Sequence, residues 1–271
     1  MPKVQVNEVE IAYRVRGAGD PLVLIGGFSM VKESWGLQVQ GLARHFRVIT
    51  LDNRGVGETR IPAGPFHVSD MAADTVGLMD ALDIDAAHVF GVSMGGLISQ
   101  TLALDHPDRV RKVVLGCTTH GGKHAVRPTL EVMEALGRAT DPTAPVEEAV
   151  RDWVPTMFSE RFMREETGRV ADFVRFSVLN WPTPEGAAGQ IAALSVFNVR
   201  RRLGEIRCPV LAIAGSEDRM MPPENARLLA EGIPGAEHYV VEGAGHGFFF
   251  EKPEEVNRVL LDFFKKQETS P

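Results

Sequence analysis

The sequence has little of what defines several large classes of protein. Only two of its 271 residues are cysteines, Cys117 and Cys208, which excludes a disulfide-rich scaffold and favours a reducing compartment. The longest run of basic residues is three, at 200–202, no basic stripe is interleaved with aromatic residues, and the formal net charge is -7. Nucleic acid and anionic membranes are therefore not expected as partners.

Long apolar runs are also missing. The longest, such as residues 21–25 and 248–250, are far too short to span a bilayer. The first ten residues are polar and acidic, with no apolar segment after a basic one, so no signal peptide is expected. Together with the low cysteine content, these observations predict a cytoplasmic protein.

What the sequence does contain is an alternation of strand and helix patterns. Strands are expected at residues 4–9, 11–16, 21–25, 46–51, 87–92, 110–116, 209–214 and 237–241, and helices at 34–43, 68–82, 97–104, 223–231 and 253–264. The first two strands form an antiparallel hairpin in this interpretation. The rest predict an α/β fold, with a mostly parallel sheet and helices on both faces.

One long segment interrupts this alternation. Residues 117–203 contain several helical patterns, joints marked by proline and many aromatic residues, but no convincing strand. We expect this segment to be a helical cap inserted into a core formed by residues 1–116 and 204–271. A chain of 271 residues that is 44% hydrophobic is large enough for one such domain.

A short turn between a strand and a helix is the strongest chemical signal. Gly91-Val92-Ser93-Met94-Gly95 reads G-x-S-x-G, the pattern of a nucleophile elbow, in which a strained turn pushes the serine hydroxyl out of the sheet. An ordinary strand-to-helix turn would also fit this pattern. An acid and a base placed near the serine would favour the nucleophile elbow over an ordinary turn.

A serine hydroxyl becomes a good nucleophile only when a base removes its proton, and an imidazole oriented by a carboxylate does this near neutral pH. After Ser93, one expected strand ends in a turn with Asp218, and the next ends in a glycine-rich turn with His246. Both residues would lie at the carboxyl end of the sheet, where sites gather in such folds. Glu217, beside Asp218, is expected to be exposed.

These motifs together resemble the α/β-hydrolase family over nearly the whole chain. The matching pieces are the elbow G-V-S-M-G-G, the turn G-S-E-D-R-M-M-P, the turn G-A-G-H and the stretch D-N-R-G-V-G-E-T. The resemblance implies an α/β-hydrolase fold and a catalytic triad of Ser93, Asp218 and His246. It points to the branch of capped serine esterases and enol-lactonases.

The resemblance also implies an oxyanion hole, formed by the backbone N–H groups of Phe28 and Met94. In relatives, the loop that carries the first donor usually begins with a histidine, but Gly26 stands at that position here. A side chain that normally braces the loop is therefore missing. We expect the backbone donors to be retained and the shape of the loop to differ.

Apolar residues of the cap and of the core are candidates for the substrate pocket. These are Trp153, Met157, Phe158, Trp181 and Phe248. Packing of helices onto the core explains most such residues equally well, but a lid over the site must line its pocket. Because no pair of arginines is clearly placed to bind a dianion, a small to medium, largely apolar substrate is expected.

The leading hypothesis is a serine hydrolase of the carboxylesterase type that acts on a small-molecule ester without a cofactor. Enol-lactone hydrolases, cofactor-free haloperoxidases or perhydrolases, and carbon–carbon bond hydrolases are alternatives with the same triad. Val92 replaces an asparagine usual in the last group and counts against it. A non-catalytic ligand-binding protein of this fold is a further alternative.

Metal binding and assembly are less well indicated. His120 and His124 lie four residues apart, but two glycines between them weaken a helix and no third ligand is evident, so no metal site is expected. The sequence leaves the oligomeric state open, with a homodimer among the options.

Overall fold

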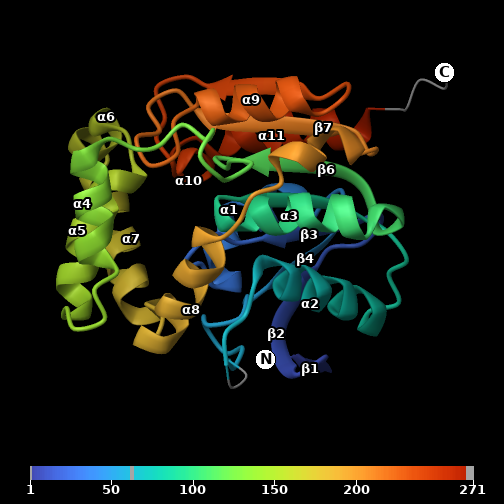
Figure 1. The fold of residues 1–271 in the computed structure, drawn as a ribbon, viewed down its shortest axis with the longest axis horizontal. Helices are drawn as coiled ribbons and strands as arrows, with labels where there is room; N and C mark the ends of the chain where they lie inside the picture. Colours follow the sequence, from blue (N-terminus) through green and yellow to red (C-terminus); the bar gives the residue numbers. More distant parts are fainter. Residues whose placement is uncertain (1, 62–63, 267–271) are drawn as a thin grey trace.

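The computed structural model describes residues 2–61 and 64–266, and a single eight-stranded sheet forms its centre (Figure 1). The strands are β1 (Lys3–Val6), β2 (Val9–Arg16), β3 (Pro21–Ile25), β4 (Arg47–Leu51), β5 (Ala87–Val92), β6 (Val110–Gly116), β7 (Val210–Gly215) and β8 (Glu237–Val241). They lie in the order β1-β2-β4-β3-β5-β6-β7-β8. Strand β2 pairs antiparallel with β1 and β4, and the other neighbours are parallel. The mostly parallel α/β sheet expected from the sequence is confirmed.

Helices connect and cover these strands. Those of the core are η1 (Lys32–Trp35), α1 (Gly36–Leu42), α2 (Val68–Ala81), α3 (Met94–Asp105), η2 (Pro107–Arg109), η3 (Arg200–Glu205), α9 (Glu224–Gly232), α10 (Phe248–Glu251) and α11 (Pro253–Lys265). The helices between β6 and η3 are α4 (Leu130–Ala139), α5 (Val146–Met157), α6 (Glu160–Glu165), α7 (Thr167–Asn180) and α8 (Pro184–Ser195). None of the helices in the described residues is both long and apolar enough to cross a membrane.

The two faces of the sheet bury alternate residues of the same strands. In β3, Val23 and Ile25 pack with helices α2, α3 and α9, whereas Leu22 and Leu24 pack with α1, α10 and α11. This period of two is what a strand covered on both faces requires. The expected coverage of both faces by helices is therefore confirmed.

One boundary differs from the prediction at a place that matters for function. The helix expected over residues 97–104 begins at Met94, directly after Ser93. Gly95 and Gly96 have low helix propensity, so the sequence pattern hides the first turn of this helix. The strand therefore passes into the helix through a single residue.

The helices α4–α8 lie together beyond the carboxyl ends of the strands, beside the core rather than over a face of its sheet (Figure 1). Helices α5 and α6 share an apolar cluster with α7, built around Trp153, Phe158, Phe162 and Phe173. We propose that residues 117–203 form the cap, since the described part of this segment contains helices and an isolated bridge but no strand.

The loop after β4 is held by buried charges. Asp52 accepts hydrogen bonds from the backbone and side chain of Lys32, at 2.6 and 2.8 Å. Arg54 donates from Nε and Nη2 to Asp74 of α2, at 2.5 and 2.9 Å, and both side chains are buried. These pairs fasten the loop to neighbouring elements.

Loss of the Asp74 carboxylate leaves the Arg54 guanidinium buried and unpaired. We expect Asp74→Ala to lower the free energy of unfolding by about 3–5 kcal/mol, measured by urea denaturation. Asp80→Ala is the matched control, because its ion pair with Arg109 lies at the surface, with the Asp80 side chain 62% exposed. That control is expected to cost about 1 kcal/mol or less. Equal losses in the two variants would contradict the importance of the buried pair.

Candidate active site

Ser93 occupies a strained turn between β5 and α3. Its backbone has φ 53° and ψ -118°, a conformation that residues other than glycine rarely adopt. The Ser93 N–H donates to the Gly116 carbonyl, and the Ser93 carbonyl accepts from the Thr118 hydroxyl, both at 2.8 Å. These bonds on either side fix the turn, and the geometry is that of a nucleophile elbow.

Two glycines make this turn possible. A Cβ at Gly91 would overlap with the Gly95 carbonyl oxygen, and a Cβ at Gly95 would overlap with the Ile25 carbonyl oxygen. Strand β5, helix α3 and the loop after β3 can therefore approach one another only where no side chain intervenes.

His246 and Asp218 form a hydrogen-bonded pair, as the sequence predicts for their positions at strand ends. The Nδ1 atom of His246 lies 2.8 Å from Oδ2 of Asp218, and both residues are buried. The other carboxylate oxygen accepts from the backbone N–H groups of Met220 and Met221, at 2.9 and 2.7 Å. Asp218 is thus held from both sides, whereas the neighbouring Glu217 is exposed as expected.

Burial and charge act on His246 in opposite directions. Burial lowers its pKa, but the adjacent Asp218 carboxylate, by its charge and its hydrogen bond, and the Cys117 sulfur beside the ring together outweigh burial and hold the pKa well above the ordinary value of 6.5. Cys117 lies beside this pair, and burial raises the pKa of its thiol, so the sulfur is neutral near pH 7. Asp218 is therefore the charged partner of the imidazole.

The loop after β3 lies directly against Ser93. A Cβ at Gly27 would be 3.0 Å from the Ser93 Cβ, so the loop passes close to the hydroxyl. Among the loop hydrogen bonds of the described residues, none is donated by the N–H of Phe28 or of Met94. We propose that these two N–H groups bind the oxyanion at this position.

Three strained residues surround the same place. Ser29, Ser93 and Cys117 have φ values of 62°, 53° and 38°, and the other non-glycine residues with positive φ in the described chain are Asn7 and Asp83. Strained backbone gathers at functional sites when the surrounding structure over-determines it. This concentration marks the turn, the loop after β3 and the end of β6 as one functional unit.

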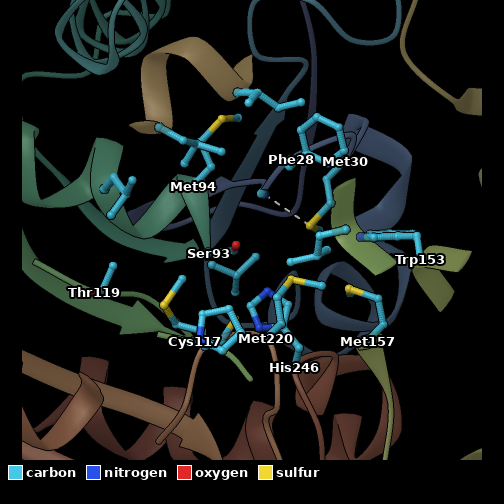
Figure 2. A pocket seen from close by; sticks show the side chains of 18 of the residues that line it. Phe28, Met30, Ser93, Met94, Cys117, Thr119, Trp153, Met157, Met220 and His246 are labelled. Carbon is cyan, nitrogen blue, oxygen red and sulfur yellow. Dashed lines mark hydrogen bonds between the residues drawn. The ribbon is translucent and has the colours of Figure 1, made fainter. Parts of the chain in front are cut away.

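A cavity of about 380 Å³ opens beside Ser93. Ser93 and His246 line it together with Cys117, and most of its remaining wall is apolar (Figure 2). Two of the predicted pocket residues, Trp153 and Met157, form part of this wall, and so do Phe28 and Met94. The cavity is thus bounded by both the core and the cap.

Three of the five predicted pocket residues do not line this cavity. Phe158 packs against Phe162 and Phe173 of the cap and against Phe250 of α10, and its side chain is fully buried there. Phe248 is buried in the core between the sheet and α11, and the next residue, Phe249, lines the cavity instead.

The third of these residues is Trp181, which lines a second cavity and packs edge-on against Phe28, with ring centroids 6.0 Å apart. This second cavity also measures about 380 Å³ and lies between η1, α5 and α7. Four residues, Met30, Trp153, Met157 and Phe249, line both cavities and separate them. Two of the four are methionines, whose side chains adapt easily to different neighbours.

Sequence reasoning missed the residues that brace the site. Glu251 accepts from the N–H groups of Gly245 and Ser159, at 2.7 and 3.0 Å, and from the Ser159 hydroxyl at 2.6 Å. It therefore ties the loop that carries His246 to the cap. Gln190 of α8 similarly reaches the loop that carries Phe28. Both are polar residues that bond distant parts of the chain, and no local sequence motif marks such contacts.

One group of side chains in the described residues is close enough to hold a metal ion. It consists of Cys117, Asp218 and His246, whose ligand atoms lie within 4.8 Å of one another. His120 and His124, the pair weighed from the sequence, are not part of it. Since Asp218 and His246 already bond to each other, this group fits an acid–imidazole pair and we assign no metal to it.

The fold and the site geometry define an enzyme of the α/β-hydrolase class. The chain belongs to this family, because residues 20–253 match the family described as alpha/beta hydrolase fold. It is 30% identical to "Putative carbamate hydrolase RutD" from Azorhizobium caulinodans, over 97% of this chain and 98% of that protein. It is 34% identical to "Putative non-heme bromoperoxidase BpoC" from Mycobacterium tuberculosis, over 94% of this chain and 98% of that protein.

A solved structure is similar over nearly the whole length. The crystal structure of the enol-lactonase from Burkholderia xenovorans superposes with a TM-score of 0.87 and 30% identity, covering 98% of this chain and all of that chain. The family and these relatives support a hydrolase. Their names give three different reactions, so these relatives do not define the substrate of this chain.

The raised pKa of His246 predicts a specific pH dependence. A protonated imidazole cannot accept the serine proton, so kcat/KM should rise with pH, with a midpoint above 6.5. Asp218→Asn removes the charge that raises this pKa and should lower kcat by on the order of 10⁴-fold. An NMR titration of the His246 imidazole in that variant should give a lower pKa than in the wild type. An unchanged imidazole pKa would contradict the role of Asp218.

Proposed function

We propose that this protein is a serine hydrolase that cleaves carboxylic esters of small to medium, largely apolar substrates. The observation that carries the proposal is that Ser93 and His246, with Asp218 hydrogen-bonded behind the imidazole, line one apolar cavity. A nucleophile, its base and an orienting carboxylate are the parts that acyl transfer requires.

In the proposed reaction, the Ser93 oxygen attacks the acyl carbon while His246 accepts the hydroxyl proton. The oxyanion that forms is stabilised by the N–H groups of Phe28 and Met94. His246 then donates the proton to the departing alkoxide, which leaves as the alcohol, and an acyl ester remains on Ser93. Water attacks this ester while His246 accepts its proton, and the imidazolium then returns that proton to the Ser93 oxygen as the acid leaves.

The wall of the cavity favours an ester over more polar substrates. Most of its side chains are methionine, leucine, phenylalanine and other apolar residues, and its volume of about 380 Å³ suits a small ligand. A lactone is a cyclic ester and needs the same chemistry, and the similarity to an enol-lactonase makes it the second candidate. We also propose a cytoplasmic location, which the two free cysteines support.

Removal of the nucleophile tests this assignment. We expect Ser93→Ala to reduce turnover of p-nitrophenyl butyrate by on the order of 10⁵-fold or more, with an unchanged melting temperature. Ser195→Ala is the control, since that hydroxyl is exposed on the cap and donates only to the Ala192 carbonyl. Substantial residual activity in the Ser93 variant would rule out the serine mechanism. An enol-lactone assayed in parallel separates the two candidate substrates.

The wall between the two cavities predicts a change in chain-length preference. Met157→Ala should open the second cavity to an acyl chain, and each CH₂ group buried there contributes about 0.8 kcal/mol. Two such groups raise the ratio of kcat/KM for octanoate over acetate esters by about tenfold.

Met163→Ala is the matched control for this wall variant. Met163 packs against the cap cluster and is absent from the lining of both cavities in the described structure. The control should leave the octanoate-to-acetate ratio unchanged. An equal ratio in the two variants would show that Met157 does not limit the length of the acyl chain.

A further inference from the structure

A fully buried glutamine of the cap reaches the loop that carries the first oxyanion donor. Gln190 lies on α8, and its Oε1 accepts a hydrogen bond from the Ser29 N–H at 3.1 Å. Its Nε2 donates to the Arg54 carbonyl at 2.9 Å. Both ends of the carboxamide are thus occupied, and 161 residues of sequence separate Gln190 from Ser29.

The residue that donates this hydrogen bond to Gln190 has a strained backbone. Ser29 has φ 62°, a left-handed conformation that favours glycine and that a serine adopts only when its surroundings enforce it. Ser29 directly follows Phe28, so the orientation of the Ser29 peptide and that of the Phe28 N–H are coupled through one residue. The carboxamide of Gln190 is the hydrogen-bond partner of the Ser29 N–H, and the Met30 N–H closes the same turn by donating to the Gly27 carbonyl at 3.2 Å.

Other contacts support the loop but do not replace this bond. Asn53 donates to the Gly26 carbonyl at 3.0 Å. The Gly27 N–H donates to the sulfur of Met30 at 3.2 Å, the bond that ends at the labelled Met30 in Figure 2. The first contact lies before Phe28 in the chain, and the second joins Gly27 to Met30 across the turn. Gln190 acts on the far side of Phe28, at the peptide through which the chain enters the left-handed residue Ser29.

The glutamine itself rests on a rigid support. The Arg54 carbonyl that it bonds belongs to a residue whose side chain is locked to Asp74 by two hydrogen bonds. The backbones of Gly55 and Gly186 touch nearby, so closely that a Cβ on either would overlap with the other. Helix α8 therefore docks directly on the loop after β4, which limits how far Gln190 can move.

We propose that Gln190 is a positioning residue that sets the oxyanion hole by fixing the Ser29 peptide, and thereby the N–H of Phe28. This proposal rests on the proposed hydrolase function. A donor held in place in advance stabilises the developing oxyanion, and even a small displacement weakens it. Loss of Gln190 should therefore affect the tetrahedral state far more than the binding of the ester.

The test compares two buried glutamines changed to methionine, which has nearly the same size and no hydrogen-bonding amide. Gln190→Met removes the bond to Ser29. Gln38→Met is the control, because Gln38 is 1% exposed and donates to the Phe249 carbonyl at 2.7 Å on the other face of the sheet. Melting temperature, kcat and KM for p-nitrophenyl butyrate, and the Ki of phenylboronic acid are measured for both variants.

Gln190→Met should lower kcat by about tenfold or more and raise the Ki of the boronic acid, which forms a tetrahedral adduct, by a similar factor. KM should stay within about twofold of wild type. Gln38→Met should lower the melting temperature comparably while kcat and Ki stay near wild type. Values of kcat and Ki near wild type in Gln190→Met, or equal losses in both variants, would overturn the proposal.

Hydrogen exchange separates this proposal from the proposed function. Backbone amides of residues 26–30 should exchange faster in Gln190→Met than in wild type or Gln38→Met. If wild-type protein neither hydrolyses esters nor is labelled at Ser93, the proposed function fails while exchange still tests the role of Gln190. Unchanged exchange in residues 26–30 would overturn the positioning role by itself.

Discussion

The left-handed turn at Ser93 is the constraint on which the rest of this site depends. It exists because β5, α3 and the loop after β3 approach to backbone contact at Gly91 and Gly95. The same approach places Gly27 against Ser93 and leaves the N–H groups of Phe28 and Met94 without partners in the described loops. A single close approach of backbones therefore shapes the nucleophile and the proposed oxyanion hole together.

The cap takes part in this arrangement from two sides. Glu251 joins the His246 loop to Ser159, and the Gly247 N–H donates to the Met157 carbonyl at 2.6 Å. On the opposite side, Gln190 joins α8 to the loop of Phe28. Contacts of this kind connect the cap to the base and to the oxyanion loop. The cap is thus built into the support of the site as well as into the wall of its cavity.

The sequence predicted the features that have a local cause. Strands buried on both faces show as short apolar runs, and the turns with Ser93, Asp218 and His246 follow such runs directly. The structure brings Asp218 and His246 within hydrogen-bonding distance and places His246 and Ser93 on one cavity. The order of the strands makes this possible, because β5, β6, β7 and β8 are parallel neighbours.

The pocket and its supports could not be predicted in the same way. Phe158 and Phe248 are apolar and close in sequence to residues that do line the cavity, and only three-dimensional packing shows that their rings face the cap cluster and the core. Gln190 and Glu251 act through bonds to residues 161 and 92 positions away. Neither bond leaves a periodic or local pattern in the sequence.

Labelling with a fluorophosphonate tests the serine-nucleophile mechanism most directly. The reagent forms a stable adduct only with a serine that a base has activated, and tandem mass spectrometry locates the adduct. We expect one adduct per chain, on Ser93, and no adduct in the His246→Ala variant. An unlabelled wild-type protein, or an adduct on another residue, would contradict the assignment of Ser93 as the activated nucleophile of this cavity.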